Sequence, residues 1–108
     1  MAQPLTQQVL QGETRVYRGS GGISQENGGY GFRPAFLDTL TDSIHLSRFA
    51  DGRPAPFHSI DGLPEALVLE RDRNGKIMAA KPSVISGFVR DGRFYTRDEA
   101  ATCVSSCH

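Results

Sequence analysis

Residues 84–101, VISGFVRDGRFYTRDEAA, hold two apolar runs, a tight turn and the start of a helix. Asp91-Gly92 separates VISGFVR from RFYT, and this dipeptide supplies the two positive-φ residues that a type I′ hairpin needs. Thr96 and Glu99 form a capping box, because each side chain can bind the other residue's backbone amide. The stretch therefore predicts a β-hairpin that leads directly into a helix beginning at Arg97.

Apolar runs separated by turn signals continue upstream of this hairpin. EALVLERD and KIMAAK flank Arg73-Asn74-Gly75, where Asn-Gly predicts a second type I′ turn. FRPAFLD and SIHLSRF are expected to pair across residues 39–42. The sequence predicts an α+β, mostly β fold: a small antiparallel meander of hairpins with a short C-terminal helix. We favour an open sheet packed on that helix over a closed barrel.

The predicted core consists of the apolar positions in these runs. At 108 residues, the chain has room for one small core. We expect that core to contain Phe32, Phe36, Leu37, Ile44, Leu46, Leu67, Leu69, Ile77, Ile85, Phe88, Val89 and Phe94.

The first third of the chain carries weaker structural signals. Six glycines fall within residues 19–31, GSGGISQENGGYG, and glycine at this density is costly to order. We expect residues 1–29 to be a flexible arm, with a short strand at Thr14–Arg18. Residues 30–101 are predicted to be a single β-rich domain, and residues 102–108 a tail.

Composition limits the classes of partner and compartment. Twelve basic residues balance twelve acidic ones, so no overall field attracts nucleic acid or an anionic membrane. The opening MAQPLTQQVLQ has neither a basic start nor a long apolar run, which indicates no leader peptide or membrane span. Both cysteines lie in the last six residues, so they cannot form the disulfide framework that is typical of small secreted domains. We expect a bacterial, cytoplasmic protein without a membrane role.

The tail contains the candidate metal ligands Cys103, Cys107 and His108. Three residues separate the two cysteines, whereas the c-type haem attachment signature has two. Zinc needs four ligands, so His45 or His58 would have to supply the fourth. We expect a frayed tail that holds neither a metal nor another cofactor.

His58 is the candidate catalytic base. It lies in the loop PAPFHSIDGLP with Ser59 and Asp61, but triad residues usually come from separate segments. A small hydrolase-like enzyme that uses His58, or a metal-binding protein that uses the Cys/His tail, is therefore an alternative function. The favoured interpretation has no catalytic residue.

Arginine dominates the basic residues, with ten Arg against two Lys. Arg90 and Arg93 face each other across the Asp91-Gly92 turn, an unfavourable pairing that suggests an anionic partner. Arg97 follows just after Tyr95. The sequence thus predicts a partner-binding surface of Arg90, Arg93, Tyr95 and Arg97. The alternative is a solvated network in which nearby acidic residues neutralise the arginines; these are Asp91, Asp98 and Glu99.

One resemblance covers the C-terminal fifth of the chain. SGFVRDGRFYTRDEAA resembles a hairpin-plus-helix unit at the end of small proteins carried by phages and other bacterial mobile elements. The matching positions are Gly87, Phe88, Gly92, Arg93, Phe94, Arg97, Glu99 and Ala100. The resemblance implies a folding unit rather than an activity, and it carries over no catalytic residue.

These observations lead to a non-enzymatic interaction module as the first functional hypothesis, with a mobile-element accessory role suggested by the resemblance. Its partner would be a protein or a protein–nucleic-acid assembly bound through the arginine and aromatic surface. The alternative is a single-stranded nucleic-acid binder that stacks bases on Tyr30, Phe57 and Tyr95. The zero net charge counts against that alternative.

Overall fold

The computed structural model describes residues 4–106. Its strands form two antiparallel sheets, which confirms the predicted α+β, mostly β fold. The larger sheet has the order β2-β1-β5-β6, from β1 (Arg33–Asp38), β2 (Ser43–Leu46), β5 (Val84–Arg90) and β6 (Arg93–Thr96). The smaller sheet pairs β3 (Val68–Arg71) with β4 (Ile77–Ala80). The topology is not a simple meander, because β3 and β4 separate β2 from β5 in the sequence while β1 pairs with both β2 and β5.

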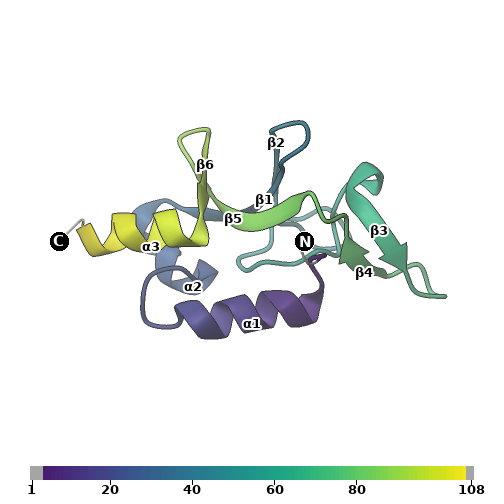
Figure 1. Ribbon diagram of the computed structural model, residues 1–108, viewed down its shortest axis with the longest axis horizontal. Helices are drawn as coiled ribbons and strands as arrows, with labels where there is room; N and C mark the ends of the chain where they lie inside the picture. Colours follow the sequence, from purple (N-terminus) through teal and green to yellow (C-terminus); the bar gives the residue numbers. More distant parts are fainter. Residues whose placement is uncertain (1–3, 107–108) are drawn as a thin grey trace.

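The helices gather on one side of the larger sheet (Figure 1). They are α1 (Gln7–Tyr17), α2 (Ser24–Asn27) and α3 (Arg97–Ser106), with the 3-10 turn η1 (Gly28–Tyr30) directly after α2. The other 3-10 turn, η2 (Glu65–Leu67), leads into β3. The β3–β4 hairpin lies at the opposite end of the molecule from α3 (Figure 1). One face of the larger sheet is therefore covered by helices.

The C-terminal hairpin and helix have the predicted geometry. Asp91 and Gly92 both have positive φ, 53° and 79°. The Thr96 amide donates to Glu99 Oε1 at 2.9 Å, and the Glu99 amide donates to Thr96 Oγ1 at 3.1 Å. The capping box therefore starts α3 at Arg97, as predicted.

The β3–β4 hairpin exists, but its turn is not the predicted type I′ turn. Gly75 has a φ of 84°, whereas Asn74 is not among the positive-φ residues of the described chain. The Asp72 carboxylate accepts from the amides of Asn74 and Lys76, at 2.8 Å and 2.9 Å. These bonds hold Arg73 and Asn74 in a turn that runs from Asp72 to Lys76. Within this turn only Gly75 has the left-handed backbone conformation.

The N-terminal segment contains a helix where the sequence predicted an arm and a strand at Thr14–Arg18. That strand prediction is wrong, because α1 extends to Tyr17. Thr6 caps α1 by accepting from the Val9 amide at 3.1 Å. Leu5 and Leu10, on either side of the cap, are both buried in the main core. Their positions match a hydrophobic staple, which fixes the helix entry.

The core only partly matches the predicted set. Phe32, Phe36, Leu67, Ile77 and Phe88 are buried, as predicted. The other predicted members are half-buried, namely Leu37, Leu46, Ile85, Val89 and Phe94, or exposed, namely Ile44 and Leu69. In register, Leu37 pairs with Ile44 and Ile85, and side chains on paired residues share a sheet face. The helices cover the opposite face, which carries Phe36 and Phe88.

Candidate functional site

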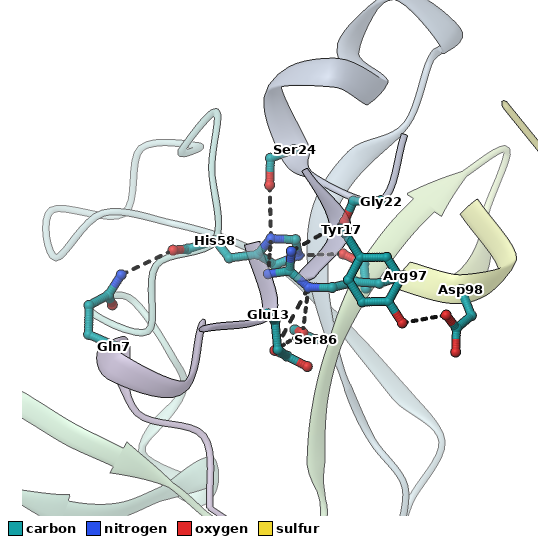
Figure 2. Close-up of polar contacts among 10 residues, drawn as sticks. Gln7, Glu13, Tyr17, Gly22, Ser24, His58, Ser86, Arg97 and Asp98 are labelled. Carbon is teal, nitrogen blue, oxygen red and sulfur yellow. Dashed lines mark hydrogen bonds and ion pairs between the residues drawn. The ribbon is translucent and has the colours of Figure 1, made fainter. Parts of the chain in front are cut away.

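Arg97 is the first residue of α3, and its side chain points into the molecule (Figure 2). Only 3% of Arg97 is exposed. Its Nε donates to Ser86 Oγ at 3.1 Å, Nη1 to the Gly22 carbonyl at 3.2 Å and Nη2 to His58 Nδ1 at 3.1 Å. The prediction that Arg97 belongs to a surface with Arg93 is therefore wrong.

Glu13 brings a carboxylate from α1 to the same cluster. Its Oε1 lies 3.8 Å from Arg97 Nε and accepts from Ser86 Oγ at 2.7 Å. Burial lowers the pKa of Arg97, and the Glu13 charge opposes that shift. An arginine keeps its proton in a protein, so the cluster holds a buried cation shared by α1, β5 and α3.

His58 is the second buried member of this cluster. Its Nε2 lies 2.6 Å from the Gly87 carbonyl, and its Nδ1 lies 2.8 Å from Ser24 Oγ. A guanidinium can only donate and a carbonyl can only accept, so Nδ1 is the acceptor and Nε2 carries the proton. Burial, and then the charge of Arg97, lower the pKa of His58 to about 3. His58 is therefore neutral at pH 7.

The Ser24–His58 pair superficially resembles a nucleophile with its base. A working base needs a free lone pair and a pKa near the operating pH. Here the Nδ1 lone pair is shared with Arg97, and Nε2–H is bound to a backbone carbonyl instead of a carboxylate. The ring also packs edge-on against Phe36 and Phe88, with centroids 5.6 Å and 5.1 Å away. This geometry suits a structural histidine.

The β5–β6 turn carries what we call the turn surface: Arg90, Arg93 and Tyr95. Arg90 and Arg93 are paired in register, as predicted. The Arg90 guanidinium carbon lies 4.5 Å from the Phe32 centroid and 5.5 Å from the Tyr95 centroid. That of Arg93 lies 5.0 Å from the Tyr95 centroid. Aromatic rings thus hold both cations in place.

Asp98 and Glu99, two of the three carboxylates expected to neutralise this surface, have other partners. Asp98 accepts from the Tyr17 hydroxyl, and this bond raises the pKa of Tyr17 to about 12. Glu99 caps the Thr96 amide. Within residues 4–106, ion pairs join Arg53 to Asp51, Arg71 to Glu65 and Arg97 to Glu13. Neither Arg90 nor Arg93 has an ion pair in the described chain.

The predicted metal ligands do not form a site in the described residues. Cys107 and His108 lie outside those residues. Cys103 is half-buried, and its Sγ accepts from Arg90 Nη2 at 3.5 Å. His45 Nε2 lies 3.2 Å from Ser43 Oγ on the same strand. No group of three or more His, Cys, Asp or Glu residues that could hold a metal ion occurs between residues 4 and 106.

The predicted base-stacking residues have separate environments. Tyr30 and Phe57 are 41% and 42% exposed. Phe57 packs edge-on against Phe49 at 5.6 Å, whereas Tyr95 packs edge-on against Phe32 at 5.1 Å. The ring contacts among the described residues therefore do not join these three side chains into one stacking platform.

Comparisons with protein-family models, curated proteins and solved structures gave no match to the chain. Over the described residues, none of the helices has the length and apolar character needed to cross a membrane.

Proposed function

We propose that the chain is a non-enzymatic interaction module whose turn surface binds an acidic segment of a partner protein. The observation that carries the proposal is the pair of arginines, Arg90 and Arg93, held side by side without an ion pair in residues 4–106. Like charges placed opposite each other on a hairpin repel. A carboxylate ligand would relieve that repulsion.

The form of the turn surface suits carboxylate recognition. A ring beneath a guanidinium leaves its N–H edge open to a carboxylate in bidentate geometry. Exposed Arg93 offers such an edge, whereas Arg90 Nη2 already donates to Cys103 Sγ and Arg90 contributes mainly its charge. The type I′ turn at Asp91-Gly92 and the contact with Tyr95 restrict both side chains before binding. Binding therefore costs less side-chain entropy than it would on a mobile loop. Strand β6 is also an edge strand, where an extended segment can add backbone hydrogen bonds.

The other functional hypotheses have less support. A His58 with a pKa of about 3 and both nitrogens engaged is a poor general base at neutral pH, which counts against a hydrolase. Net charge zero counts against nucleic-acid binding. We further propose a cytoplasmic setting, because Cys103 is a free thiol, and an accessory role in a bacterial mobile element, from the resemblance of residues 86–101.

A fluorescence-anisotropy titration with a labelled Glu-rich peptide tests the proposal. Arg93→Glu should weaken peptide binding at least tenfold, or about 1.4 kcal/mol, with little change in the urea midpoint. The matched control is Arg73→Glu, an exposed arginine in the β3–β4 turn, which should bind like the parent. Unchanged binding by Arg93→Glu would refute the proposal. Tighter binding of a labelled oligothymidylate than of the peptide would favour the nucleic-acid alternative instead.

A further inference from the structure

A cleft on the α1 side of the molecule is separate from the turn surface. It lies between α1, the segment at residues 18–24 and the loop that carries Phe57 and His58, and its volume is about 650 Å³. This volume falls within the range of about 300–1,000 Å³ that is usual for small-molecule sites. The proposed protein-binding function does not use the cleft.

The inner part of the cleft is apolar with one hydroxyl. Leu10 and Ile23 are buried lining residues, and Phe57 is an exposed aromatic ring at the wall. The buried Ser24 hydroxyl also lines the cleft and is fixed by its hydrogen bond to His58 Nδ1. These groups offer a rigid surface that fits a flat apolar body.

The outer part of the cleft is cationic. Arg15 lies in the last turn of α1 and Arg18 is its C-cap, and both side chains are exposed lining residues. No ion pair to either of them occurs within residues 4–106, and no lining residue is acidic. The helix C-terminus is equivalent to only about half a negative charge, which two guanidinium groups exceed. Behind His58, the charge of Arg97 is offset by Glu13, so Arg15 and Arg18 give the cleft its cationic character.

We propose that this cleft binds a small organic anion that combines a flat apolar body with a carboxylate, phosphate or sulfonate group. The anionic group binds the guanidinium forks of Arg15 and Arg18. The flat body lies against Leu10 and Ile23 and beside the ring of Phe57. Both parts are needed, because exposed arginines alone bind anions weakly in water and salt.

Anilinonaphthalene sulfonate is a suitable probe, because it joins flat aromatic rings to a sulfonate. The parent should bind it in a saturable one-to-one titration followed by fluorescence. The double variant Arg15→Glu/Arg18→Glu should weaken binding at least tenfold. Arg73→Glu/Lys81→Glu is the matched control, since it makes the same charge change at exposed positions outside the cleft lining, and it should bind like the parent.

Competition separates the two parts of the site. Benzoate should displace the probe at lower concentration than either acetate or benzyl alcohol. Acetate has the carboxylate without the ring, and benzyl alcohol has the ring without the charge. Phe57→Ala should weaken benzoate competition and leave acetate competition unchanged. Equal binding by the parent and the cleft double variant, or equal competition by benzyl alcohol and benzoate, would overturn the proposal. Arg93→Glu should leave probe binding unchanged, so failure of the turn-surface proposal is distinguishable from failure of this one.

Discussion

Arg93 and Arg97 are four positions apart, yet they have opposite environments. Arg93 is exposed and rests against Tyr95, whereas Arg97 is buried and donates to Ser86, Gly22 and His58. The two side chains have the same chemistry, so the difference comes from what the fold places around each. An arginine inside the fold stabilises it when its donors are matched, and an arginine without an ion pair at the surface is available to a partner.

The covered face of the sheet shows how one surface produces both environments. Side chains alternate along β5, so Ser86, Phe88 and Arg90 share a face. Ser86 and Phe88 are buried, and Arg90 near the turn is half-buried. The burial of side chains on this face therefore decreases along β5 toward the β5–β6 turn. The capping box redirects the chain at Thr96 and brings Arg97 back to the level of Ser86.

Removing the Arg97 guanidinium should have the largest effect on stability. Arg97→Met keeps much of the side-chain volume but removes three hydrogen bonds and the ion pair with Glu13. We expect a loss of about 3 kcal/mol in the free energy of unfolding, measured by urea denaturation. Arg93→Met is the control and should lose less than about 0.5 kcal/mol. An equal loss of unfolding free energy in the two variants would contradict the account, because Arg97 would then stabilise the fold no more than Arg93 does.

Acid should destabilise the protein through His58. The pKa of His58 is about 3 in the fold, and about 6.5 for an ordinary unfolded histidine, so the unfolded chain binds the extra proton between these values. Stability is thus complete above pH 6.5 and falls as pH decreases toward 3, by about 1.5 kcal/mol between pH 6.5 and pH 5 from this group.

The variant His58→Gln isolates this contribution, because its amide can still donate to the Gly87 carbonyl. Urea unfolding at pH 6.5 and pH 5 should show a smaller acid loss for His58→Gln than for the parent. His45→Gln, on β2, should keep the parental loss. An identical acid loss in the parent and His58→Gln would show that His58 is accessible to protons in the fold.

A smaller effect is expected at the turn that presents Arg90 and Arg93. Gly92 has a φ of 79°, and a Cβ added there would have no neighbouring atom within 4 Å. Gly92→Val should therefore strain the backbone without a side-chain clash. We expect a loss of about 1 kcal/mol in urea denaturation. Gly12→Ala, inside α1 and also in open space, should instead stabilise by a few tenths to about 1 kcal/mol. A Gly92→Val protein as stable as the parent would mean that the turn is not held in this form.

Local signals predicted β5, β6 and the start of α3 well, but the tail predicted at residues 102–108 is wrong as far as Ser106, because α3 continues to that residue. The Asp91-Gly92 turn and the Thr96–Glu99 capping box each involve residues close in sequence, and each appears as predicted. The Asn74-Gly75 turn failed because Asp72, outside the dipeptide, binds the turn amides. Helix α1 was missed although Leu5, Thr6 and Leu10 have the spacing of a capped and stapled helix.

The buried cluster could not be predicted from the sequence because its members come from distant segments. Glu13, His58 and Arg97 are on α1, a loop and α3, and no local pattern links them. One signal was present: Ser86 alternates with Phe88 along β5, which places a polar residue on the covered face. A polar residue buried beside Phe88 requires a partner, and Arg97 provides it.

The separate roles of Arg93 and Arg97 are tested most directly by hydrogen exchange at their Nε–H groups, followed by ¹⁵N NMR. Signals can be assigned with Arg90→Lys and Arg93→Lys variants, which should remain folded. The Nε–H of Arg97 donates to Ser86 inside the protein, so it should exchange at least a hundredfold more slowly than that of Arg93. Comparable exchange rates for the two groups would contradict the account, because Arg97 would then be as open to water as the surface arginine.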